Sequence, residues 1–299
     1  MNAMKHLAMI VCGALALAGC TQPADVELTR DGYESDLEVR AVVVPDTNIV
    51  VPEVDATGVL PEELMTVNGV MLINDIRNEE SIDNIAITSY ALLFLADSTV
   101  RDLSGRMIGY SGADLGTVSL NGQAMTQLPH RVVLRRLLRP DTTLLRGYEY
   151  RADLTGQYRP GEFYTWTYMH QSMGDRSESI LAPERVQVQS PPVIGGGVVE
   201  SARDLELVWR GGQGTLSIII STVDVQSRRV RPLLELRSRA NSGRALLPAK
   251  ILQQLARLQH RFLFTFVLAN RRELRPGLND ASRILIQAAS IVNRHVELR

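Results

Sequence analysis

The sequence is poor in cysteine, lysine and long apolar runs. Its two cysteines, Cys12 and Cys20, lie in the first twenty residues, so no internal disulfide is expected to stabilise the rest of the chain. Lys5 and Lys250 are the two lysines among 32 basic residues. Such a uniform preference for arginine over lysine is typical of codon bias in a GC-rich genome, and it does not point to a binding site. The later histidines follow no metal-ligand spacing, which excludes an obvious zinc site: His130, His170, His260 and His295.

The first twenty residues have the layout of a secretory signal. Residues 1–6 carry one fixed positive charge, residues 7–18 are almost wholly apolar, and small residues follow. An apolar run of about twelve residues is too short for a transmembrane helix, which needs about twenty. Since no later stretch reaches that length without charge, we expect no transmembrane helix.

The end of this segment reads Leu17-Ala18-Gly19-Cys20, which resembles the lipobox of bacterial lipoproteins in all four positions. The resemblance implies a signal peptide over 1–19, cleavage before Cys20, and lipid on the thiol and the new amino group. The alternative is a simple signal peptide with an incidental cysteine. Thr21 stands where the enterobacterial rule has Asp for retention in the inner membrane, so the family comparison implies a lipid anchor in the outer membrane, facing the periplasm or the cell surface.

Residues 20–65 are predicted to form a lipidated acidic tether. Eleven acidic residues stand there against Arg30 and Arg40, a composition typical of a solvated segment. Residues 37–44 begin with the alternation of a half-buried strand. Whether this piece, and residues 37–50 as a whole, pairs with the first domain is left open by the sequence.

Residues 66–190 read as successive short strands with turns about every ten residues, which predicts a β-sandwich. Asn121-Gly122 is a strong hairpin signal. The order from Tyr148 onward, with Pro160-Gly161 and an aromatic strand, resembles the second half of an immunoglobulin-like domain, an architectural likeness that carries no function. Strands are predicted over 85–95, 117–120, 123–128, 131–138, 148–154, 162–170 and 184–189.

A proline- and glycine-rich stretch, residues 190–197, predicts a linker to a second, smaller β domain over 198–299. One short helix near 248–258 is expected in it, because Pro248 opens an apolar stripe at helical spacing. This region loosely resembles C-terminal modules of uncharacterised envelope lipoproteins, which have no activity to carry over. The predicted fold class is therefore all-β, with two β-sandwich-like domains after the tether.

Motifs for catalysis or phosphate binding are missing: there is no nucleophile elbow, P-loop, dinucleotide-binding glycine motif or helical His pair. No cofactor is expected, and an enzyme is the less favoured reading. Asp75, Glu79, Glu80 and Asp83 form an acidic cluster, but it lacks the ligand spacing and central glycine of an EF-hand loop. A solvated acidic loop is favoured over a weak cation site.

An alternating aromatic pattern is the most suggestive feature of the chain. Tyr164, Trp166, Tyr168 and His170 share one face of a predicted strand. If that face is exposed, it is a platform for stacking on sugars or peptides. If it is buried, Trp166 is the core tryptophan of a sandwich, and this second reading is favoured.

The charges are unevenly distributed along the chain. Residues 21–100 hold three arginines and sixteen acidic residues, whereas residues 101–299 hold 28 basic and 17 acidic residues. Either the basic part meets an external polyanion such as lipid phosphates, or the acidic tether folds back over it. Scattered, solvated arginines are the plainer alternative.

Three functions are compatible with these observations. The leading one is a noncatalytic envelope lipoprotein that binds or scaffolds; the others are a glycan-binding or glycan-active lipoprotein, and an accessory subunit of an envelope assembly or transport complex. The expected partners are the membrane, through lipid on Cys20, and an envelope protein or polyanion. No nucleic-acid partner is expected.

Overall fold

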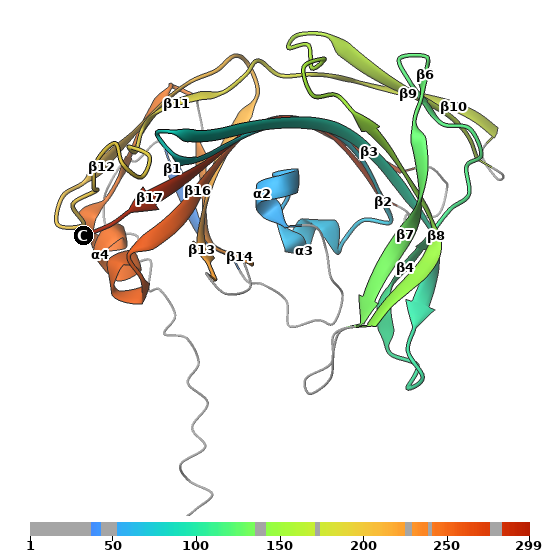
Figure 1. Ribbon diagram of the computed structural model, residues 1–299, viewed down its shortest axis with the longest axis horizontal. Helices are drawn as coiled ribbons and strands as arrows, with labels where there is room; N and C mark the ends of the chain where they lie inside the picture. The colour runs from blue at the N-terminus through green and yellow to red at the C-terminus, as the bar shows by residue number, and fades with distance from the viewer. Residues whose placement is uncertain are drawn as a thin grey trace, which may run out of the picture. The chain divides into compact units, whose positions relative to one another are not determined.

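The computed structural model describes residues 37–42, 53–134, 142–170, 174–224, 229–238, 241–275 and 283–299. These residues are mostly strands, so the predicted all-β class is confirmed (Figure 1). The helices in this part of the chain are α2 (Val54–Thr57), α3 (Pro61–Leu64) and α4 (Ala249–Leu258). Of these, α4 confirms the helix predicted near 248–258.

Ten strands form one large sheet in the order β1-β14-β13-β16-β17-β2-β3-β4-β8-β7. Their bounds are β1 Leu37–Ala41, β2 Gly69–Ser81, β3 Asn84–Arg101, β4 Met107–Gly112, β7 Thr126–Leu134, β8 Thr142–Asp153, β13 Thr215–Val223, β14 Val230–Ser238, β16 Arg261–Leu274 and β17 Ile284–Glu297.

Two smaller sheets accompany it. One has the order β10-β9-β5-β6 and the other β11-β12-β15. Their bounds are β5 Ser119–Leu120, β6 Gln123–Ala124, β9 Phe163–His170, β10 Gly174–Leu181, β11 Gln187–Ser190, β12 Leu205–Arg210 and β15 Arg244–Leu247. The Asn121-Gly122 hairpin is confirmed: both turn residues have positive φ, 49° and 79°, as a type I′ turn requires.

The expected boundary at residues 190–197 is not a domain boundary. Strand β17, from the predicted second domain, pairs in parallel with β2, from the predicted first domain, from Ile284↔Gly69 to Arg294↔Glu79. The described residues from Leu37 to Arg299 belong to one compact unit. The two-domain prediction is therefore wrong, because this pairing joins both ranges in one sheet.

Strand β1 resolves the question left open for residues 37–44. It pairs antiparallel with β14 from Leu37↔Ser238 to Ala41↔Leu234. The segment therefore joins the edge formed by the C-terminal part of the chain and not the part over 66–190. Residues 43–52 lie outside the described residues.

The central strands are buried on both faces. One face packs Met71 and Ile73 against the four-stranded sheet, in a core that includes Trp166 and Leu93. The other face packs against α2 and α3, around which the sheet curves (Figure 1). Burial on both faces explains why residues 262–269 of β16 form a nearly continuous apolar run rather than an alternating one.

Polar side chains from the sheet hold the C-terminal end of α2. The last carbonyls of a helix have no partner within the helix. Here four consecutive carbonyls, those of residues 55–58, accept hydrogen bonds from side chains of distant strands. Asn293 donates to the carbonyl of residue 55 at 2.8 Å, and both Asn74 and Tyr90 donate to that of residue 56, at 3.2 and 2.7 Å. Gln287 donates to the carbonyl of residue 57 at 2.7 Å, and Arg271 to that of residue 58 at 2.6 Å.

Residues 53–65 are thus part of the folded unit, which corrects the tether predicted over 20–65. Val54, Val59 and Leu60 are almost fully buried. The acidic residues of this segment pair with arginines: Glu62 with Arg40 at 2.8 Å, and Glu63 with Arg237 and Arg271 at 3.4 and 3.2 Å. Most of the tether, residues 20–36 and 43–52, lies outside the description.

Charge pairing between the two parts of the chain continues in the sheet. Asp75 pairs with Arg185 at 2.8 Å, and Glu79 pairs with Arg294. Asp75 and Glu79 lie outside the predicted tether, so these two pairs do not decide whether the tether folds back over the basic part; the pairs of Glu63 with Arg237 and Arg271 agree with that alternative. The uneven charge of the sequence is therefore explained in part by internal ion pairs.

Asp55 supplies a pH-dependent prediction. Burial raises the pKa of this carboxyl above its usual 3.8, opposed in part by backbone N–H groups and by His295. Its Oδ1 is buried without a hydrogen-bond partner among the described residues. A raised pKa means that stability is full below about pH 3.8 and is lost as the pH rises through the folded-state pKa. We expect Asp55→Asn to melt above wild type at pH 7 and with wild type at pH 3.5.

Asp153→Asn is the control of opposite sign. Hydrogen bonds from Thr155 lower the pKa of Asp153, so its contribution is present above the unfolded pKa and lost in acid. Its amide variant should be no more stable than wild type at pH 7. Equal melting shifts for the two variants would contradict the role assigned to burial at Asp55.

Candidate functional site

The predicted aromatic face lies inside the core. On β9, Tyr164, Trp166 and Tyr168 are 4%, 0% and 3% exposed. Thr165, on the opposite face, hydrogen-bonds Ser179 of β10 at 2.7 Å. An exposed ligand platform is therefore wrong for these three residues, and the favoured reading of Trp166 as a core tryptophan is confirmed. The side chain of His170 lies outside the described part.

The tyrosines of this core have structural hydrogen bonds. Tyr164 Oη accepts the backbone N–H of Arg159 at 2.8 Å, and Tyr158 Oη donates to the carbonyl of Pro183 at 3.0 Å. Burial raises the pKa of both phenols. They are therefore held neutral and serve as hydrogen-bonding groups rather than as bases.

The acidic cluster is likewise not a loop. Asp75 and Glu79 belong to β2 and are each 5% exposed. Asp75 accepts from Ser89 Oγ at 2.6 Å and from Arg185 Nε at 2.8 Å, so the Arg185 guanidinium neutralises this carboxylate. Glu80 and Asp83 are exposed near the β2–β3 turn. Within the described ranges, no group of His, Cys, Asp and Glu side chains is arranged to hold a metal ion.

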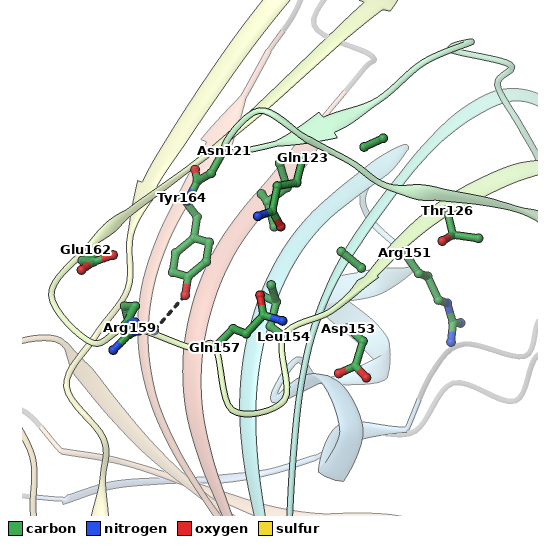
Figure 2. Close-up of a pocket in the computed structure, with 13 residues that line it drawn as sticks. Asn121, Gln123, Thr126, Arg151, Asp153, Leu154, Gln157, Arg159, Glu162 and Tyr164 are labelled. Atoms are coloured by element: carbon green, nitrogen blue, oxygen red, sulfur yellow. Dashed lines mark hydrogen bonds between the residues drawn. The ribbon is translucent and has the colours of Figure 1, made fainter.

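A polar cleft is the candidate binding site that the structure adds. It has a volume of about 330 Å³ and lies between the β5–β6 turn, the end of β8 and the start of β9 (Figure 2). Such a volume is at the small end of ligand sites. Its lining consists of Leu120, Asn121, Gln123, Ala124, Thr126, Arg151, Ala152, Asp153, Leu154, Gln157, Arg159, Glu162 and Tyr164.

Backbone turns hold the walls of the cleft in place. The β5–β6 turn is fixed on β9, because Asn121 exchanges hydrogen bonds with Thr165: Asn121 N donates to Thr165 O, and Asn121 Oδ1 accepts from Thr165 N, both at 2.8 Å. Below it, Gln157 N donates to Leu154 O at 2.7 Å and closes the turn after β8. Tyr164 lies between the two walls, with its hydroxyl toward Arg159 (Figure 2).

The charges around the cleft balance. Arg151 and Arg159 stand with Asp153 and Glu162. Arg151 is engaged by Glu149 at 2.8 Å. Asp153 accepts the N–H of Thr155 at 2.8 Å, which lowers the pKa of its carboxyl. An acid held ionised in this way is a poor proton donor, since general acids need a raised pKa. The cleft is equipped to hydrogen-bond a small polar group.

Sequence reasoning missed this cleft. The signal for one wall was present in Asn121-Gly122, but nothing local indicates that this turn lies above Tyr164 and opposite Gln157. The lipid-site prediction, Cys20, lies outside the described residues. No described helix combines the length and apolar character that a membrane span requires.

Comparisons with known proteins leave the family open. No protein-family model matches the chain, and no curated protein matches it. A solved structure that does match is described as the crystal structure of DIP-gamma IG1+IG2; it is 12% identical, and the match covers 77% of this chain and 95% of that chain. The TM-score is 0.19, too low for the match to support an argument about fold or function. The all-β class rests on the strands themselves.

Proposed function

We propose that this protein is a membrane-anchored envelope lipoprotein whose β unit binds or scaffolds a partner without catalysis. The observation that carries the proposal is Leu17-Ala18-Gly19-Cys20 at the end of an apolar signal segment. A processed lipoprotein carries more than one acyl chain, and two chains are enough for stable anchoring. Thr21 favours the outer membrane for the anchored protein.

The noncatalytic part of the proposal is supported by the candidate site. Asp153 is held ionised, the tyrosines of the neighbouring core are held neutral, and Arg151 is already paired. The glycan-binding alternative loses its main support, because Trp166 is buried. Part of the positive charge that a polyanion would meet is neutralised within the chain, because Arg185, Arg271 and Arg294 are already paired with acidic side chains.

Replacing Cys20 with alanine tests the anchor. We expect Cys20→Ala to remove incorporation of labelled palmitate and to leave the protein in the soluble fraction or unprocessed, because the thiol that receives the lipid is gone. Cys12→Ala is the matched control: it removes the other cysteine, which lies in the apolar signal segment, and should keep both labelling and membrane retention. Normal labelling of Cys20→Ala would overturn the proposal.

The outer-membrane assignment has its own test. In an enterobacterial host, wild type should sediment with outer-membrane markers in a density gradient. Thr21→Asp should shift the protein toward the inner-membrane fraction, while Thr21→Ser should not. Wild type in the inner-membrane fraction would refute the location and leave the lipid anchor standing.

A further inference from the structure

Strand β3 has an outer edge that its neighbours cover only in part. Its inner edge pairs with β2 from Asn84 to Leu95. Along the outer edge, β8 pairs with Tyr90 to Leu93, and β4 pairs from Ala96 onward. Among the described residues, no strand pairs with the outer edge over residues 84–88, hereafter the free edge. Figure 1 shows β3 continuing beyond its contact with β8.

The hydrogen bonds at Ser89 show which backbone groups point outward. Ser89 N donates to Thr155 Oγ1 at 3.2 Å, and Ser89 O accepts from Leu154 N at 2.8 Å, so both groups point away from β2. In an antiparallel pair this direction alternates from residue to residue. Ile87 and Ile85 therefore also direct their N–H and C=O groups outward, into the free edge.

The free edge is apolar and has neither charge nor proline; a register shift in the β2–β3 pairing is confined to its start, between Glu79 and Ser81. Ile85 and Ile87 are 46% and 52% exposed, and residues 84–89, Asn-Ile-Ala-Ile-Thr-Ser, contain no charge. Proteins normally protect strand edges with charged residues, proline or bulges. By contrast, β1, which forms one edge of the large sheet, is a strand of five residues that carries the charged residues Glu38 and Arg40. The apolar, open edge of β3 is thus suited to strand addition.

Acidic residues flank both ends of the free edge. Glu80 and Asp83 are exposed near the β2–β3 turn, and Asp153 is exposed where β8 leaves β3. Three arginines lie nearby, and each is already paired: Arg77 with Glu79 at 2.7 Å, Arg151 with Glu149 at 2.8 Å and Arg185 with Asp75 at 2.8 Å. A strand that lies along the free edge therefore meets negative charge at both its ends, and lysine or arginine there complements it.

A second copy of the chain fits this edge poorly. The free edge is five residues long, or about 17 Å. A stable dimer buries about 800 Å² on each partner, and pairing along five residues is too short to bury that area. Antiparallel pairing of two free edges also brings Asp83 of one copy near Asp153 of the other, which places like charges together at both ends. Length and charge both favour a short basic segment of another protein.

We infer that the free edge of β3 binds an extended segment of a partner protein as an added strand. The segment carries lysine or arginine at both ends and apolar side chains at the alternate positions that lie beside Ile85 and Ile87. Backbone hydrogen bonds to those two residues provide the pairing. The inference deepens the proposed binding role by giving it a site and a class of partner.

A peptide with this pattern tests the inference. The probe is acetyl-Lys-Thr-Val-Thr-Val-Thr-Lys-amide, added to the full chain in detergent, with binding followed by fluorescence anisotropy and amide hydrogen exchange. We expect exchange to slow at least tenfold at Ile85 and Ile87. The amides of Ala86 and Thr88, which face β2, should not change. Replacing both lysines of the probe with glutamate should weaken binding at least tenfold at low salt.

Variants at residue 87 separate backbone pairing from side-chain contact. Ile87→Pro removes an outward N–H without removing a bond to β2, and is expected to weaken probe binding about tenfold, as for the loss of one hydrogen bond. Ile87→Val is the matched control and should bind within about twofold of wild type. If Ile87→Pro melts below wild type, the double variant Ile85→Thr/Ile87→Thr, which keeps both N–H groups, should still weaken binding.

Several outcomes would overturn the inference: no binding, binding that protects neither Ile85 nor Ile87, or binding unaffected by Ile87→Pro. A dimer of the wild-type chain in sedimentation that Ile87→Pro dissociates would assign the edge to a second copy instead. Cys20→Ala should bind the probe as wild type does, so a failure at this edge and a failure of the lipid anchor are read separately.

Discussion

Replacing Arg294 with methionine is expected to lower the free energy of unfolding by about 3 to 5 kcal/mol, the usual cost of breaking a buried ion pair from one side. The Arg294 side chain is 9% exposed and pairs with Glu79. It also donates to the carbonyls of Pro191 and Val188, at 2.7 and 2.8 Å. Its removal leaves the buried Glu79 carboxylate with the half-exposed Arg77 as its remaining ion-pair partner, and leaves two carbonyls without this donor. Denaturant unfolding followed by circular dichroism measures the loss.

The matched control lies on the other side of the same carboxylate. Arg77 pairs with Glu79 at 2.7 Å, but its side chain is 46% exposed. Arg77→Met should therefore cost at most about 1 kcal/mol. The double variant Glu79→Leu/Arg294→Met should recover part of the loss, because it also removes the buried carboxylate that has lost its buried partner. Equal costs for Arg77→Met and Arg294→Met would refute the role given to burial.

Trp166→Ala is expected to cost about 3 to 5 kcal/mol, as large-to-small changes in a core do. Trp166 is fully buried where the large sheet packs on the four-stranded sheet. Its ring N–H has no partner among the described residues, so Trp166→Phe loses no hydrogen bond and should be milder. Thermal unfolding of the variants gives the comparison.

Phe163 is the control on the same strand. It is 65% exposed, so Phe163→Ala should change stability by no more than about 0.5 kcal/mol. If Trp166→Ala unfolded no more easily than Phe163→Ala, the packing between the two sheets would not depend on the aromatic face of β9.

Local patterns were sufficient for much of the secondary structure. A β-branched and aromatic run predicted the strand near 85–95, aromatic alternation predicted the one near 162–170, and Asn121-Gly122 predicted its hairpin, because these signals need only neighbouring residues. The helix after Pro248 was predicted for the same reason. The burial of Trp166 followed from its threonine neighbours on β9.

Pairing between strands and side chains far apart in the chain could not be predicted from local sequence patterns. Strand β2 was missed because Asp75 and Glu79 made it read as a solvated loop, and their partners, Arg185 and Arg294, lie 110 and 215 residues away. The boundary at 190–197 failed because proline and glycine mark a connection without indicating whether sheet pairing crosses it. The α2 segment was taken for tether because its sequence is acidic, and the side chains that hold its carbonyls belong to distant strands.

The cleft and the free edge of β3 differ in how far the sequence could predict them. The cleft combines residues from three separate turns, and only the fold brings Asn121, Gln157 and Arg159 together. The isoleucines of the free edge were part of a predicted strand. Their exposure depends on where the pairing of β8 with β3 ends, which is at Tyr90. No local sequence pattern predicts that end point.

The place of β17 has a consequence for how the protein is made. It is the last described strand to leave the ribosome, yet it lies between β16 and β2 in the middle of the sheet. The growing chain therefore lacks the strand that joins its two parts until residues 284–297 have been made, and pairing between such distant segments is slow. A chain that crosses a membrane before folding benefits from this delay. A nonsense mutation or proteolytic cut that removes residues 284–299 takes out the centre of the sheet rather than trimming its edge.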